Sequence, residues 1–135
     1  MTPVQSAEWF VVCPVAELGP GEKRIVQVGR MSIGVFNVEG TYFAVQNVCP
    51  HRGAQLCLGD ITGTMLPSKP GDFIYGREYE VLTCPWHRWE FDLRTGRSLV
   101  DPEGTRVAVY EVETRADDVV LPLTARGRPI ARQVA

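Results

Sequence analysis

The chain has 135 residues, of which 44% are hydrophobic and 22% charged, a composition typical of a single globular domain and not of a disordered chain. Its 14 basic and 16 acidic residues give a net charge of −2, which argues against a nucleic-acid-binding surface. The early apolar stretch at residues 9–16 is too short to span a bilayer, and the N-terminal residues show no export signal, so we expect a cytoplasmic protein with no membrane partner.

Short β-rich segments separated by turn residues follow one another along the chain. The 13 glycines and 10 prolines make turns frequent, and no helix-length window shows a 3.6-residue period. The clearest alternation of apolar and polar residues, at 106–113, predicts one half-buried strand. The predicted strands, in chain order, are residues 9–13, 25–28, 33–38, 41–45, 80–83, 89–92, 106–113 and 119–121.

These elements predict an all-β fold, a sandwich or barrel-like stack of antiparallel sheets, in one domain over residues 1–124. Residues 64–76 contain two prolines and two glycines, and predict an irregular excursion. Residues 125–135 carry three arginines and no acid, and predict a loosely held basic tail.

Two segments carry the residues that suggest chemistry. Cys49-Pro50-His51 has the spacing C-x-H, and Cys84-Pro85-Trp86-His87 has the spacing C-x2-H, with 32 residues between them. Each segment offers one thiolate and one imidazole on a short proline-containing loop at a predicted strand end. Two metal sites fit this donor set: a tetrahedral zinc ion, or a [2Fe–2S] cluster with both cysteines on one iron and both histidines on the other.

The spacing favours the cluster. Structural zinc sites usually take like ligands in pairs from each loop, and C-x-H is short for two ligands on one tetrahedral ion. Ligands from one loop can instead reach two irons, roughly 3 Å apart in such a cluster. The predicted ligands use both histidines of the chain, so none remains as a catalytic base, and no small-molecule substrate site is evident. They are Cys49, His51, Cys84 and His87.

These motifs resemble those of the Rieske family, and specifically of its soluble ferredoxins. Residues 49–53, Cys-Pro-His-Arg-Gly, match the first family box, residues 84–87 match the second, and residues 91–96 resemble the hairpin that follows it. The resemblance covers residues 8–121 and implies a smaller cluster-binding subdomain at about 47–97. The gap between the boxes is longer than in compact ferredoxins, with the excess at 64–76, and Arg88 stands where relatives commonly have glycine.

The resemblance implies a one-electron carrier, not an enzyme, that uses one Rieske-type [2Fe–2S] cluster to pass electrons from a reductase to a terminal oxygenase or similar acceptor. Trp89 and Phe91 align with the hydroxyl-bearing residues of high-potential relatives. We therefore expect a potential in the lower part of the Rieske range of about −150 to +300 mV. Five residues beside the ligands are expected to support the cluster, shield it or dock partners: Arg52, Gly53, Trp86, Arg88 and Trp89.

Two alternatives remain open from the sequence. One is a small cluster-bearing subunit of a reductase complex, of the nitrite reductase type. The other is a zinc-stabilised binding module without a redox role. Cys13 and Cys57 are predicted to be buried, reduced thiols, and the acidic residues between 101 and 118 to form a solvated face.

Overall fold

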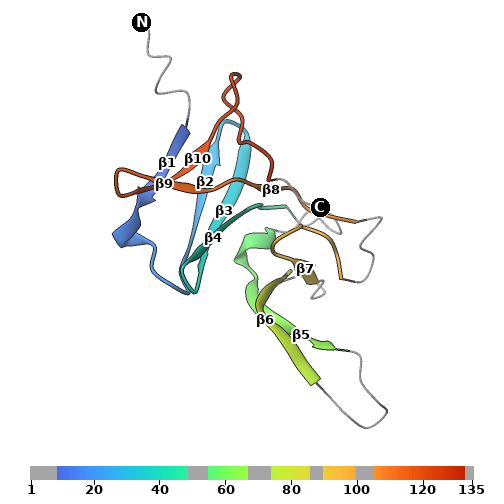
Figure 1. Cartoon of the computed structure of the whole chain (residues 1–135). Helices are drawn as coiled ribbons and strands as arrows, with labels where there is room; N and C mark the ends of the chain where they lie inside the picture. Colours follow the sequence, from blue (N-terminus) through green and yellow to red (C-terminus); the bar gives the residue numbers. More distant parts are fainter. Residues whose placement is uncertain (1–8, 49–54, 67–73, 86–89, 100–104, 133–135) are drawn as a thin grey trace, which may run out of the picture. The chain divides into compact units, whose positions relative to one another are not determined.

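The computed structural model describes residues 9–48, 55–66, 74–85, 90–99 and 105–132, with only the backbone path for most of 60–80 (Figure 1). The chain divides into two compact units, residues 1–47 with 108–135, and residues 48–107. The described residues form three antiparallel sheets and two short 3-10 turns, so the all-β prediction is confirmed. No helix in this described part is long and apolar enough to cross a membrane.

The first unit contains two of the sheets. One has the strand order β1-β10-β9, and the other has the order β2-β3-β4-β8. Every pairing in them is antiparallel, as expected for strands joined by short turns. The bounds are β1 Trp9–Pro14, β2 Lys23–Val28, β3 Met31–Val38, β4 Thr41–Gln46, β8 Val109–Tyr110, β9 Glu113–Arg115 and β10 Asp118–Pro122.

Apolar side chains from both sheets share one core. Val12 and Cys13 of β1 pack in the same buried cluster as Ile33 of β3 and Val119 of β10. The cysteine is 4% exposed, which confirms the prediction that it is buried. Burying this apolar surface supplies the main favourable free energy of folding for the unit.

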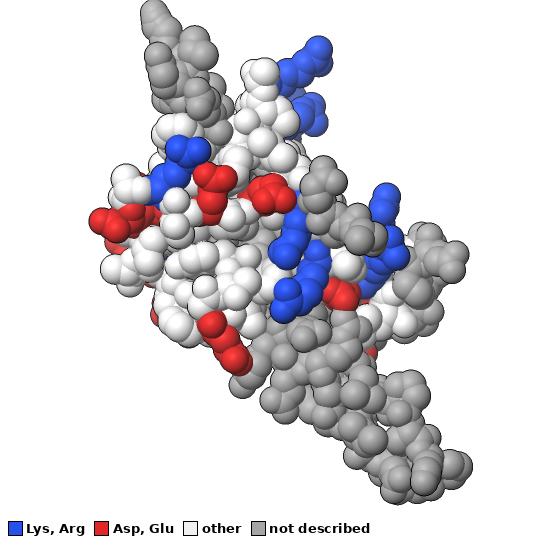
Figure 2. All heavy atoms as spheres, viewed as in Figure 1, with Lys and Arg blue, Asp and Glu red and all other residues white. Residues whose placement is uncertain are grey.

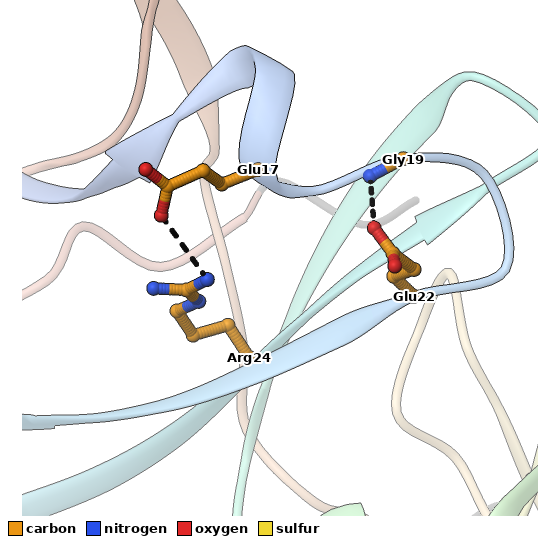
Figure 3. Close-up of polar contacts among 4 residues, drawn as sticks. All are labelled: Glu17, Gly19, Glu22 and Arg24. Carbon is orange, nitrogen blue, oxygen red and sulfur yellow. Dashed lines mark hydrogen bonds and ion pairs between the residues drawn. The ribbon is translucent and has the colours of Figure 1, made fainter.

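The β1–β2 connection is held by polar contacts (Figure 3). After the short turn η2, Val15–Glu17, the backbone N–H of Gly19 donates to the Glu22 carboxylate at 2.6 Å. Arg24 lies 3.5 Å from Glu17 in an exposed ion pair. The buried Asn37 amide donates to the Leu18 carbonyl at 2.9 Å, which joins this connection to β3. The β1–β2 connection is therefore fixed at several points.

The predicted strand at 106–113 is wrong as a single element. Arg106 forms a bridge to Arg97. Val109, in β8, pairs with Val45 of β4, and Glu113, in β9, pairs with Val120 of β10. The alternation exists because the segment is extended, but its hydrogen-bond partners change along its length. Alternation of apolar and polar residues indicates which side chains of a strand are buried, but it does not indicate which strand is its hydrogen-bonded neighbour.

The basic tail is not loosely held over residues 125–132. The Thr124 N–H donates to the Arg128 carbonyl at 2.7 Å, and the Arg132 N–H donates to Val109 of β8 at 3.0 Å. The Arg132 guanidinium also lies 5.1 Å from the centre of the Phe43 ring. This segment forms its own hairpin and adds backbone pairs beside β8, which the charge count alone did not indicate.

Acidic side chains follow β9 and the turn after it. Figure 2 shows Asp and Glu atoms on the face where β9 lies in Figure 1. Glu113 and Asp117 are exposed there, and Glu113 contacts Arg115 at 2.9 Å. Within the described residues, this stretch is the solvated face that the sequence predicted.

The second unit contains the turn η3, Leu56–Leu58, and a sheet with the order β5-β6-β7. The strands are β5 Asp60–Leu66, β6 Ile74–Thr83 and β7 Glu90–Asp92. Much of the excursion predicted at 64–76 is therefore strand, because Thr64 pairs with Gly76 and Leu66 with Ile74. Residues 67–73 lie outside the described residues. The extra sequence lengthens a β-hairpin, whose ladder is interrupted by a bulge after Thr62.

Candidate metal centre

The β5–β6 hairpin brings the strand that follows η3 beside the strand that precedes Cys84. Asp60, the first residue of β5, pairs with Thr83, the last residue of β6, at the open end of the hairpin. The first segment precedes β5, separated from it by η3, and the second follows β6 at once. Since antiparallel neighbours bring the start of one strand beside the end of the next, the start of β5 and the end of β6 lie at the same end of the sheet.

The second segment forms the loop between β6 and β7. Thr83 of β6 pairs with Glu90 of β7, so residues 84–89 connect two paired positions. Cys84 is fully buried at the start of this loop, and Pro85 beside it is exposed. The chain thus carries a buried sulfur donor next to the protein surface, as a metal centre that exchanges electrons with a partner requires.

The first segment lies between Val48 and η3. Leu56 and Cys57 of η3 are fully buried and anchor this turn in the unit. The burial of Cys57 confirms the prediction made for it. Val48 and Leu58, on either side of the loop, are 42% and 53% exposed. The sequence analysis did not single out these two apolar residues, because exposure cannot be read from a short apolar run.

A hydrogen-bonded turn follows β7. The Asp92 carboxylate accepts from the N–H groups of Arg94 at 2.7 Å and Thr95 at 3.2 Å. Its carbonyl accepts from the Gly96 N–H at 2.7 Å, and Gly96 has a φ of 78°. The hairpin at residues 91–96 was expected from the family resemblance, but the role of Asp92 was not. An Asp three residues before a Thr-Gly pair is a signal for such a turn.

Of the nine predicted site residues, the structure describes Cys84. The others lie outside the described residues: Cys49, His51, Arg52, Gly53, Trp86, His87, Arg88 and Trp89. Among the residues that are described, no three His, Cys, Asp or Glu side chains form a group that could hold a metal. The described framework fits a cluster site because it supplies a buried cysteine, Cys84, directly after the strand end that pairs with the start of β5.

The family model for the Rieske [2Fe-2S] domain matches residues 8–111, which include both segments. The chain belongs to the Rieske family. As a Rieske protein it carries a [2Fe–2S] cluster of the Rieske type, and this cluster supplies a one-electron redox couple.

Similar Rieske proteins include two ferredoxins. The ferredoxin component of the naphthalene 1,2-dioxygenase system of Pseudomonas aeruginosa is 28% identical, over 87% of this chain and 97% of its own length. Ferredoxin CarAc of Metapseudomonas resinovorans is 27% identical, over 82% of this chain and 90% of its own length.

A solved structure has the same fold. A chain from the complex of reduced oxygenase and oxidized ferredoxin in carbazole 1,9a-dioxygenase superposes with a TM-score of 0.68 at 25% identity. The match covers 91% of this Rieske protein and 96% of that chain.

Proposed function

We propose that this Rieske protein is a ferredoxin that carries single electrons from a reductase to a terminal oxygenase or similar acceptor. In this proposal Cys49 and Cys84 hold one iron of the cluster, and His51 and His87 hold the other. The observation that carries the proposal is the Asp60–Thr83 pair, which brings the strand after the first segment beside the strand end before the buried Cys84. The resemblance to ferredoxin components of dioxygenase systems supports the choice of partners.

The chain's own residues have three tasks in this function. The buried Cys84 thiol and the exposed Pro85 place a sulfur ligand one residue from the surface. In this proposal the buried turn η3 supports the first loop, which precedes it in the chain, and the Asp92 turn fixes the end of β7, the strand that follows the second loop. Arg52, Gly53, Trp86, Arg88 and Trp89 are proposed to line the exposed edge, shield it from water and contact the partner.

A potential in the lower part of the Rieske range is part of the proposal. Phe91 is 1% exposed and pairs with Leu82 in the sheet that carries the second loop. A phenyl ring offers no hydroxyl to a cluster sulfur, and hydrogen bonds to the sulfurs are one means by which a protein raises the potential. Such a carrier suits the transfer of electrons to an oxygenase.

The ligand set is tested with two cysteine variants. Cys84→Ala is expected to abolish the EPR signal of the reduced Rieske cluster, because it removes a sulfur ligand. Cys57→Ala is the matched control, since Cys57 is also fully buried in this unit but is not a proposed ligand. The wild type should contain two irons and two sulfides per chain. A colourless protein with one zinc would contradict the proposal and favour a zinc-stabilised module.

The partners are tested by following electrons. Reduced protein mixed with a purified Rieske oxygenase should be reoxidised and then be reduced again by a ferredoxin reductase. Copurification with a much larger reductase, and no transfer to an oxygenase, would favour the reductase-subunit alternative. The proposed location is the cytoplasm, a reducing compartment in which a buried cysteine such as Cys13 stays a thiol.

A further inference from the structure

Gly59 lies between η3, which follows the first loop, and β5, whose first residue pairs with the end of β6. The chain passes from residues 49–54 through η3 to Gly59, and β5 begins at the next residue. Asp60 pairs with Thr83, and Cys84 follows directly. Gly59 therefore lies beside the point at which the second loop leaves the sheet.

The backbone at Gly59 approaches this strand end too closely for any side chain. An ideal Cβ at this position would lie 1.8 Å from the carbonyl oxygen of Thr83 and 3.2 Å from that of Leu56. Real Cβ atoms essentially never make contacts under 3.0 Å. The φ of −77° and ψ of −177° are open to every residue, so the close approach, and not the backbone conformation, is what requires glycine.

The surrounding residues leave no room for relaxation. The Gly59 N–H donates to the Leu56 carbonyl at 2.9 Å, which ties it to η3. Leu56 and Cys57 on one side, and Leu82 and Cys84 on the other, are fully buried. Because close-packed interiors transmit strain instead of absorbing it, a methyl group at position 59 has to push η3 away from the end of β6 by about 1 Å.

We propose that Gly59 sets the spacing between the two cluster loops and acts as a positioning residue for the ligands. This inference rests on the proposed function, in which each loop supplies one cysteine and one histidine. Each iron then takes one ligand from each loop, so a change in loop spacing alters the coordination of both irons together. Small displacements of the groups that support a metal site are enough to change its properties.

The test compares Gly59→Ala with Val107→Ala, which removes a side chain that is 3% exposed in the same unit. Both variants are loaded with the cluster and compared at urea concentrations that give equal free energies of unfolding. Gly59→Ala is expected to show altered EPR g values and midpoint potential, and to lose its cluster at least about tenfold faster. Val107→Ala is expected to keep the wild-type g values and potential.

Each outcome decides a separate question. Wild-type g values and potential in Gly59→Ala, with cluster loss equal to that of the control, would overturn the inference and leave Gly59 with a stabilising role only. A wild type without a Rieske EPR signal would instead refute the proposed function. If Gly59→Ala does not fold, Leu56→Val replaces it as the test variant, because it alters the buried anchor of η3 without a clash. Shifted g values in Leu56→Val would support the inference, and unchanged g values would overturn it.

Discussion

Replacement of Asp92 by alanine should loosen the turn after β7 without touching a proposed ligand. The Asp92 carboxylate accepts two backbone hydrogen bonds, from Arg94 at 2.7 Å and Thr95 at 3.2 Å. A net hydrogen bond contributes about 0.5–1.5 kcal/mol, and loss of a comparable side-chain cap at a helix end costs about 1 kcal/mol. Since the Arg94 contact is exposed, we expect Asp92→Ala to lower the free energy of unfolding by about 1–2 kcal/mol.

Asp92→Asn is the matched control. Its amide oxygen can accept the same two hydrogen bonds, so its free energy of unfolding should stay within about 0.5 kcal/mol of the wild type. Urea unfolding of the loaded protein, followed by tryptophan fluorescence, measures this difference. The visible absorbance of the cluster measures its release, which should be about 5–30 times faster in Asp92→Ala if release follows opening of this hairpin. Equal stability of the alanine variant and the wild type, or equal losses in both variants, would refute the reasoning.

Three further perturbations test other parts of the molecule. Phe91→Tyr should raise the midpoint potential by about 40 mV, because one hydrogen bond of about 1 kcal/mol to the more negative reduced site corresponds to that shift for one electron. Phe91→Leu is the control and should leave the potential unchanged. An unchanged potential in the tyrosine variant would contradict the expectation. Leu58→Asp should slow electron transfer to the oxygenase several-fold at constant potential, since this exposed residue follows the first loop; stopped-flow rates equal to those of Leu58→Met would count against a docking role. Desolvation by burial raises the pKa of the Cys13 thiol, so the folded state keeps its proton where the unfolded chain loses it. The free energy of unfolding should therefore fall as pH rises above about 8.5, and fall less steeply in Cys13→Ala, with equal slopes arguing against the shift.

Sequence patterns located most of the strands but not their partners. Residues 33–38 and 41–45 are correctly predicted, because apolar residues on either side of a glycine turn define a local hairpin that needs no distant information. Residues 106–113 fail as one strand, because Arg106, Val109 and Glu113 pair with three different segments, of which only the partner of Val109 is distant in the sequence. The arginines of residues 125–135 suggested a loosely held tail. Backbone hydrogen bonds to β8 hold the residues before the terminus, and charge does not encode such bonds.

The sequence by itself indicated the family and restricted the metal site to two kinds, a [2Fe–2S] cluster or a zinc ion, since two cysteines and two histidines occur in the patterns C-x-H and C-x2-H; the family model then decided for the cluster. It also indicated that Cys13 and Cys57 would be buried, because small sulfur-bearing side chains in apolar surroundings favour the core. Only the tertiary structure decided that the start of β5 lies beside the end of β6, through the Asp60–Thr83 pair, and that Gly59 must lack a side chain there. The physical reason is that register and close packing are set by contacts between residues far apart in the chain, and a local pattern carries no record of the atoms on the other side of the contact.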